Sequence, residues 1–228
     1  MEIPERILAY LKETYRPDAM IVYGSFADGS ANQNSDFDAL VISDKGRMHD
    51  SSVIDGIVLD VFIYPPETFQ SETDPEAFVQ VWDGKIMMDA NGIAARLQKQ
   101  VLDYLAHMPK KMEEEIRQEI RWCEKMLSRT MREDAEGCYR WHWLLVDSLN
   151  IYFDIKGLRY LGPKKALRFL EQTDPESFRI YAKALREFRQ ERLSEWISHL
   201  KSISPAASVP VSCTIGKPQF AEVKNESL

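Results

Sequence analysis

The sequence predicts an α+β fold in which an N-terminal mixed sheet with flanking helices precedes a C-terminal all-helical bundle. Three observations support this order. Short apolar runs alternate with helical patterns at first, apolar residues follow helical spacing alone from Met108 onward, and prolines and glycines separate these segments. We therefore expect a sheet domain over residues 1–107, a helical bundle over 108–201 and a flexible tail over 202–228.

The elements of the first domain follow from short apolar runs and from apolar spacings of three and four residues. In chain order they are a helix at 4–15, a strand at 19–23, a short helix at 25–31, a strand at 36–42, a hairpin at 53–63, short helical pieces at 67–81, an edge strand at 85–89 and a helix at 93–107. Asp55-Gly56 is a pair favoured in tight turns, so we place it at the tip of the hairpin.

The second domain is predicted to contain helices throughout. Two apolar stripes at helical spacing consist of Met112, Ile116, Ile120, Cys123 and Leu127, and of Cys138, Trp141, Leu145, Leu149 and Tyr152. Pro163 and Pro175 suit the first turns of later helices, because a proline there sacrifices no helical hydrogen bond. Helices that each carry one apolar stripe bury it by packing together as a bundle.

A glycine-serine turn and two aspartates stand out in the first domain. Gly24-Ser25 follows an apolar strand, and a strand that turns through glycine into a helix start offers free backbone N–H groups to a phosphate. Asp36 and Asp38 alternate with apolar residues, so a strand would present both carboxylates on one face. Two like charges so close need a cation, and such oxygen ligands suit Mg²⁺ shared with substrate phosphates.

A third carboxylate lies within the predicted hairpin. Asp60 interrupts an otherwise apolar strand, where a lone charge is costly to bury without a partner. The Ser35-Asp36 pair by itself is also typical of a turn or a helix cap. A single site that contains Asp36, Asp38 and Asp60 explains all of these features together.

These residues resemble those of a known family. Gly24-Ser25, ten intervening residues, Asp36-Phe37-Asp38-Ala39 and the later Asp60 resemble the nucleotidyltransferase superfamily typified by DNA polymerase beta, most closely its aminoglycoside (antibiotic) branch. The resemblance implies a nucleotidyltransferase-type sheet and metal-dependent nucleotidyl transfer of the EC 2.7.7 type. It makes Asp36, Asp38 and Asp60 the catalytic residues and the ligands of two Mg²⁺ ions, with a nucleoside triphosphate as co-substrate.

Four residues are candidates for nucleotide binding. Gly24 would let the backbone approach the phosphates, and Ser25 would add a hydroxyl contact. Ser30 is a further candidate for the same phosphates, whereas Ser35 fits a role in ordering the turn before the aspartates. Lys164 in the second domain is also a candidate, although paired lysines before a helix are ordinary on surfaces.

The predicted reaction moves a nucleoside monophosphate, AMP from ATP, to a hydroxyl of a small molecule. The resemblance implies an aminoglycoside-like antibiotic as that molecule and hence antibiotic resistance. Asp147 is the candidate base that accepts the acceptor's proton, and its simpler interpretation is a solvated helix face. Since the family includes enzymes that complete their pocket across a dimer, a homodimer is compatible with the sequence.

Two other functions remain open. One is transfer of AMP to a protein, as in antitoxins that modify a helical toxin; the spacing of Arg192 and His199 fits the motif of such toxins but arises often by chance. The other is a nucleotide-binding regulatory module without turnover, against which the presence of all three aspartates argues. Labelled ATP offered with small acceptors separates the three.

Composition and charge narrow the functional class. Residues 1–107 contain 8 Lys and Arg against 18 Asp and Glu, whereas residues 108–228 contain 21 against 18. This asymmetry suits an anionic ligand held with metal, or two ordinary solvated surfaces. Basic residues are interspersed with acidic ones, so we expect no nucleic-acid partner.

The cysteines and the apolar runs bear on the cellular compartment. The three scattered cysteines predict neither a disulfide framework nor a zinc site. The sequence has no apolar run of membrane length and no signal pattern, which predicts a cytoplasmic protein.

Overall fold

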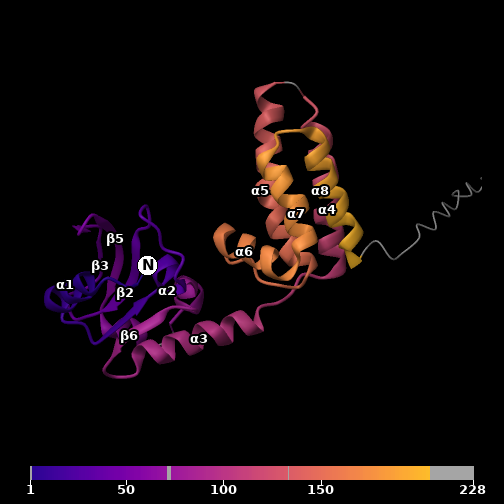
Figure 1. Cartoon of the computed structure of the whole chain (residues 1–228). Coiled ribbons are helices and arrows are strands. Elements are labelled where there is room, and N and C mark those ends of the chain that lie inside the picture. Colours follow the sequence, from indigo (N-terminus) through magenta and orange to yellow (C-terminus); the bar gives the residue numbers. More distant parts are fainter. Residues whose placement is uncertain (1, 71–72, 133, 206–228) are drawn as a thin grey trace, which may run out of the picture. The chain divides into compact units, whose positions relative to one another are not determined.

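The structure, a computed structural model, describes residues 2–70, 73–132 and 134–205. The chain divides into two compact units, Met1–Met108 and Pro109–Leu228. Among the described residues, every strand belongs to the first unit, and the second unit contains helices joined by short connections (Figure 1). The predicted α+β fold, a mixed sheet with flanking helices followed by a helical bundle, is therefore confirmed.

The first unit is built on a sheet of six strands. The strands are β1 (Ala19–Val22), β2 (Phe37–Ile42), β3 (Met48–Asp50), β4 (Val53–Ile54), β5 (Ile57–Tyr64) and β6 (Lys85–Asp89). Their order is β3-β5-β2-β1-β6, and β4 lies off this path as the hairpin partner of β5. The β2–β5 pair is parallel and the other pairs are antiparallel.

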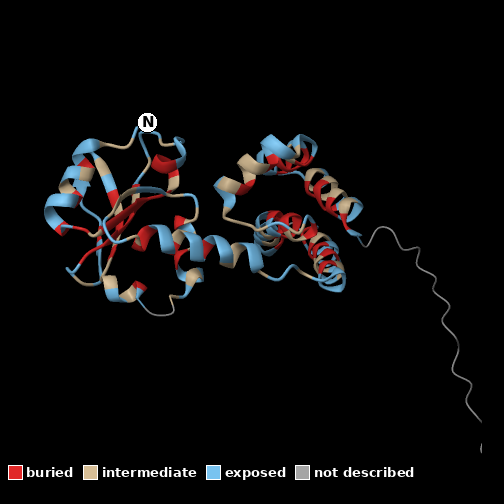
Figure 2. Ribbon diagram, turned by 90° about the horizontal axis from the view of Figure 1, so that it is seen from below, coloured by how far each residue is buried: buried red, intermediate tan, exposed pale blue. Residues whose placement is uncertain are grey.

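Helices cover both faces of this sheet. They are α1 (Glu5–Tyr15), α2 (Gly24–Asp28), α3 (Ile93–His107) and the 3₁₀ helices η1 (Pro66–Phe69) and η2 (Pro75–Val81). Leu11 of α1 belongs to the core that contains Phe37 and Val61, whereas Leu97 of α3 belongs to the core that contains Leu40. Because side chains alternate along a strand, β2 and β5 contribute to both cores, and the buried residues concentrate in the strands and the inward faces of the helices (Figure 2).

The predicted hairpin is present, and an unpredicted strand, β3, pairs with β5 beyond the two residues that pair with β4. Asp55 and Gly56 have φ values of 52° and 82°, the two positive values that a type I′ turn requires. Strand β3 was not predicted, because its three residues show no run of apolar side chains. Its pairing with β5, which aligns His49 with Phe62, defines it as a strand.

The second unit packs five helices around one core. They are α4 (Glu113–Arg129), α5 (Ala135–Ile155), α6 (Pro163–Thr173), α7 (Pro175–Arg186) and α8 (Gln190–Ile203). Helix α8 contacts α4, α5 and α7, and its fully buried Trp196 donates a hydrogen bond of 2.9 Å from Nε1 to Oγ of Ser148. Pro163 and Pro175 occupy first helical turns, as predicted.

Several details of the helical prediction are wrong. Met112 and Cys138 were placed on apolar stripes, but both are exposed: Met112 precedes the first turn of α4, and Cys138 lies near the start of α5, where it lines an open cavity. Helix α8 includes Ser202 and Ile203, which we assigned to the tail. The rest of the predicted tail from residue 206, with Cys213, lies outside the described residues.

The described helices contain no segment that is both long and apolar enough to cross a membrane.

Candidate functional site

Three aspartates from two neighbouring strands converge at one end of the sheet. In the parallel β2–β5 pair, Asp38 aligns directly with Asp60. Asp36 precedes β2 by one residue, two positions before Asp38, so it lies on the same side. One carboxylate oxygen from each residue lies within 4.8 Å of the other two. The structure thus brings together the three acids that the sequence singled out.

This arrangement creates strong local repulsion. Two unit charges 4 Å apart repel by about 4 kcal/mol at the effective dielectric constant of a protein surface. Asp36 is exposed, and Asp38 and Asp60 are partly buried, so water screens the repulsion only in part. A divalent cation among the three oxygens would reverse its sign.

Gly24 lets the turn after β1 pass close to Asp38. Its φ of +66° lies in the left-handed region, and a Cβ built at this position would overlap Oδ2 of Asp38. The backbone N–H of Tyr23 donates to the carbonyl of Asp38 over 3.1 Å, which ties this turn to β2. Only glycine combines this backbone conformation with this close approach.

Ser25 follows with a hydroxyl group that has no hydrogen-bond partner among the described residues. Its Oγ is enclosed, and the residue is 9% exposed. A buried hydroxyl without a partner is costly, and such a group points to a partner that arrives with a ligand. The phosphate contact assigned to Ser25 stays a prediction.

Two further serines lie in the loop between α2 and β2. The N–H of Ser30 donates to Oδ1 of Asp28 over 2.8 Å, and Oγ of Ser35 accepts from the N–H of Asn32 over 3.0 Å. Ser35 thus orders the turn before the aspartates, as predicted. The phosphate contact of Ser30 stays a prediction.

Sequence reasoning missed two residues beside the aspartates. His49 of β3 contacts Asp60 through Nε2 and Oδ1, which are 2.7 Å apart. Tyr23 is buried near the same acids. Burial, and then the negative charges of Asp38 and Asp60, raise the pKa of its hydroxyl. No local pattern indicated either residue, because His49 lies in a short unpredicted strand and Tyr23 resembles an ordinary strand residue.

Asp147, the predicted base, lines a cavity of about 340 Å³ in the second unit. Glu119, Trp122, Asn150 and Ile151 complete its lining. Burial raises the pKa of Glu119 even though Lys111 forms an ion pair with it, and Oε2 of Glu119 has no partner among the described residues. The cavity therefore combines carboxylates with an aromatic ring.

Lys164 lines another cavity of the second unit, of about 330 Å³. This cavity lies along α6 and α7, and its other lining residues include Arg168, Arg186 and Glu171. The cationic lining is compatible with an anionic ligand. The nucleotide contact assigned to Lys164 stays a prediction, as does the role of Asp147.

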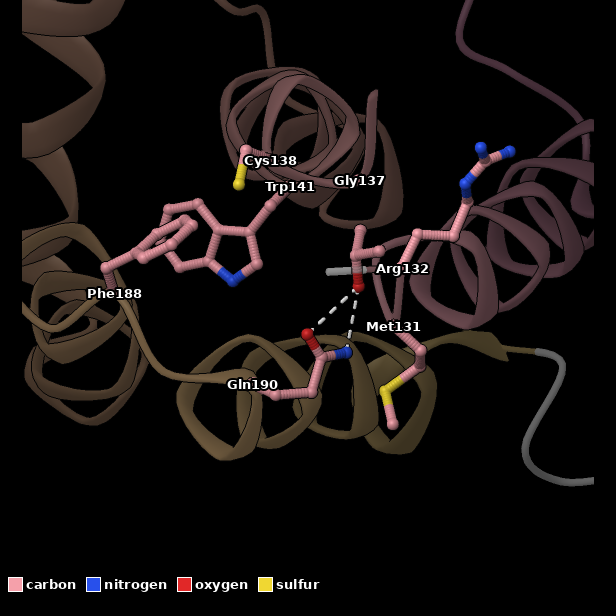
Figure 3. Close-up of a pocket in the computed structure, with 8 residues that line it drawn as sticks. Met131, Arg132, Gly137, Cys138, Trp141, Phe188 and Gln190 are labelled. Carbon is pink, nitrogen blue, oxygen red and sulfur yellow. Dashed lines mark hydrogen bonds between the residues drawn. The ribbon is translucent and has the colours of Figure 1, made fainter. Parts of the chain in front are cut away.

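A third cavity, of about 310 Å³, has a mainly apolar and aromatic lining (Figure 3). Trp141 and Phe188 form one wall, with ring centroids 4.6 Å apart. Gln190 exchanges hydrogen bonds with Thr130 at the opposite side. Arg132 is engaged by ion pairs with nearby carboxylates. The lining accordingly suits an uncharged ligand better than a phosphate.

Arg192 and His199, the toxin-like pair, make separate contacts. Arg192 forms ion pairs with Glu187 and Glu195. His199 lies 2.8 Å from Oγ of Ser177, and burial lowers the pKa of its imidazole. These contacts account for both residues as part of the bundle.

The chemistry of the first site fits a divalent metal ion and a phosphate. Three carboxylate oxygens form a hard donor set, and the missing side chain of Gly24 lets the carboxylate of Asp38 lie directly against the turn that follows β1. The unpartnered hydroxyl of Ser25 adds a hydrogen-bonding group. Asp36, Asp38 and Asp60 are thus suited to hold the metal, and Gly24 and Ser25 to approach the phosphate.

Comparison with known proteins agrees with this chemistry. The family described as "Nucleotidyltransferase domain" matches residues 4–142, more than half of the chain. A search of curated proteins finds no match. One similar solved structure is a nucleotidyltransferase-like protein from Exiguobacterium sibiricum, at 13% identity and a TM-score of 0.38, covering 86% of this chain and 71% of that one. At that TM-score the structural likeness adds nothing to the family match.

Proposed function

The chain belongs to the nucleotidyltransferase domain family, and from this premise we propose that it transfers AMP from ATP to a hydroxyl group of a small molecule. The reaction is of the EC 2.7.7 type. The observation that carries the proposal is the convergence of Asp36, Asp38 and Asp60, whose oxygens lie within 4.8 Å of one another. Such a donor set matches the metal-assisted displacement by which a hydroxyl attacks an α-phosphorus.

The side chains would divide the work as follows. Asp36 and Asp38 would bind two Mg²⁺ ions, and Asp60 would complete the ligands on the side of the attacking hydroxyl. When bound, such ions offset the charge of the triphosphate and lower the pKa of the acceptor hydroxyl. Gly24 would bring the backbone to the phosphates, and Oγ of Ser25 would donate a hydrogen bond to a phosphate oxygen.

The acceptor proposed is a cationic, hydroxylated molecule of the aminoglycoside type. What supports it is the cavity lined by Glu119, Trp122 and Asp147. Carboxylates attract ammonium groups, and the face of an indole ring stabilises a cation placed over it. Asp147 would accept the proton of the acceptor hydroxyl.

The test is incubation of the whole chain with α-³²P-labelled ATP, Mg²⁺ and a panel of aminoglycosides and neutral sugars. We expect label on a cationic acceptor, and we expect Asp38→Asn to abolish transfer because the neutral amide removes one charged ligand without changing shape. Asp44→Asn is the matched control, since Asp44 is an exposed residue of the same unit outside the cluster.

The other outcomes are informative. Label on protein would favour the protein-modifying function, and tight nucleotide binding with no transfer to any acceptor would favour a regulatory module. Undiminished transfer by Asp38→Asn would refute the assignment of the three aspartates.

A further inference from the structure

We propose that His49 is a positioning residue for Asp60, holding its carboxylate in the orientation that completes the three-aspartate cluster. The inference rests on the proposed function, because it concerns how the metal ligands of that function are arranged. It adds a residue that lies outside the aspartates and the glycine-serine turn.

A hydrogen bond joins the two side chains. Nε2 of His49 lies 2.7 Å from Oδ1 of Asp60, and their side chains are 45% and 40% exposed. An ionised carboxylate only accepts hydrogen bonds, so Nε2 must carry the proton. The imidazole thereby engages one oxygen of Asp60 and leaves the other to a metal. Carboxylates that bind metals are commonly oriented by such partners.

The imidazole of His49 is itself held in place by Phe62. Its ring stacks on Phe62, with centroids 4.6 Å apart and planes inclined by 28°. His49 and Phe62 are directly paired across β3 and β5. Phe62 lies two residues after Asp60, on the same face of β5, so the imidazole reaches diagonally from its paired neighbour to the carboxylate.

Strand β3, which carries His49, is anchored by hydrogen bonds of its next residue. The next residue, Asp50, points to the opposite face and is 7% exposed. It accepts hydrogen bonds from Oη of Tyr15 over 2.8 Å and from the N–H of Ser52 over 2.9 Å. Burial opposes ionisation of Asp50, but these bonds outweigh it and hold its pKa below the usual value. Successive side chains point to opposite faces of a strand, so the hydrogen bonds of Asp50 on one face hold the backbone from which His49 projects on the other face.

An opposite role makes the opposite prediction. If His49 instead competed with the metal for Asp60, its removal would tighten metal binding. A positioning role predicts weaker binding, because Asp60 would then have to be ordered as the ion binds. The sign of the change therefore distinguishes the two.

The experiment measures Mn²⁺ binding to the full chain by electron paramagnetic resonance, without nucleotide and without turnover. We expect His49→Ala to weaken Mn²⁺ binding by about tenfold or more. His49→Gln, which retains an N–H donor at similar reach, should restore most of the affinity. His107→Ala is the matched control, because His107 is exposed on α3 and bonds to the carbonyl of Asp103.

Thermal unfolding of each variant separates positioning from folding. Two further variants test the proposal even where His49→Ala unfolds. His49→Gln should retain Mn²⁺ affinity, and Phe62→Leu, which removes the stacking partner but keeps an apolar side chain, should weaken Mn²⁺ binding. Unchanged or tighter Mn²⁺ binding by folded His49→Ala would overturn it while leaving the nucleotidyl-transfer proposal intact. Failure of the wild-type chain to bind Mn²⁺ would overturn both.

Discussion

Gly24 shows how a single residue decides whether the site can form. Its backbone has a φ of +66°, and the space where a side chain would begin is taken by the carboxylate of Asp38, whose Cγ lies 3.0 Å from a Cβ built at position 24. Ser25 next to it contributes an enclosed hydroxyl without a partner among the described residues. The left-handed backbone of Gly24 and the unpartnered hydroxyl of Ser25 each lower the stability of this turn, and both lie beside the aspartates.

The residue-scale prediction is that Gly24→Ala impairs both stability and transfer. A left-handed alanine costs about 1–2 kcal/mol of unfolding free energy, and displacement of the Asp38 carboxylate by roughly 1 Å is expected to reduce transfer by about 100-fold. Urea unfolding and the labelled-ATP assay measure the two effects.

Gly46→Ala is the matched control for this prediction. Gly46 has a φ of +89° but has nothing within 4 Å of its Cβ position. The control should therefore show the backbone cost alone, with transfer retained. Equal activities in the two variants would mean that contact with Asp38 is unimportant.

Among the elements, the junction of α6 and α7 shows how one carboxylate orders a helix start. Asp174 lies between the two helices, and it accepts hydrogen bonds from the N–H and Oγ of Ser177 and from Oη of Tyr152, the last over 2.7 Å. Burial opposes its ionisation, but these bonds lower its pKa to about 2. The same carboxylate therefore caps α7 and links it to α5.

The element-scale prediction follows from that lowered pKa. Because the folded-state pKa is about 2 against an ordinary value of 3.8 for aspartate, the ionised carboxylate contributes roughly 2 kcal/mol of stability above pH 4. This contribution is lost as the pH falls from about 4 to about 2. Asp174→Asn should therefore destabilise the second unit at pH 7, and the difference from wild type should shrink below pH 4.

Tryptophan fluorescence during urea unfolding mainly reports on this effect, because Trp122, Trp141, Trp143 and Trp196 belong to the second unit and the fifth tryptophan, Trp82, belongs to the first. Asp74→Asn is the control: Asp74 is an exposed cap of η2 in the first unit, so the unfolding transition of the second unit should not change. A difference between wild type and Asp174→Asn that is independent of pH would contradict the electrostatic explanation.

At the scale of the whole molecule, negative charge is concentrated in the unit that contains the three aspartates. Residues 1–107 carry 18 acidic against 8 basic residues. Repulsion among these negative charges lowers the stability of the folded unit, and it is strong in the aspartate cluster, where three carboxylates lie close together. A ligand that binds only the folded state stabilises it in proportion to the logarithm of its concentration.

The whole-molecule prediction is that Mg²⁺ stabilises the chain and that chelation reverses the effect. At ten times the dissociation constant, Mg²⁺ would add about 1.4 kcal/mol, which corresponds to a rise of about 3–5 °C in Tm for a chain of this size. Scanning calorimetry with Mg²⁺ and with EDTA measures the shift.

Asp38→Asn should abolish this shift, and in EDTA it should be at least as stable as wild type, because it removes one of three repelling charges. Asp44→Asn should retain the shift. A full Mg²⁺ shift in Asp38→Asn would place the ion elsewhere.

Local patterns predicted much of the first unit. Asp55-Gly56 forms the expected turn, and the lone charge of Asp60 in an apolar strand correctly pointed to a partner. His49 was not predicted, because a strand of three residues is too short to show a periodic pattern. Only the pairing of β3 with β5 shows that His49 lies near Asp60. Cys138 was misplaced because helical spacing identifies a face but not how far neighbouring helices extend along it.

Side-chain alternation and the cost of an isolated charge are local properties, so the α+β class, the strands that carry the acids and the identity of those acids follow from the order of the residues. The parallel pairing of β2 with β5, which sets Asp38 beside Asp60, and the position of His49 on β3 became known from the fold. Register and strand order depend on the packing of the sheet against α1 and α3, which joins segments far apart in the chain.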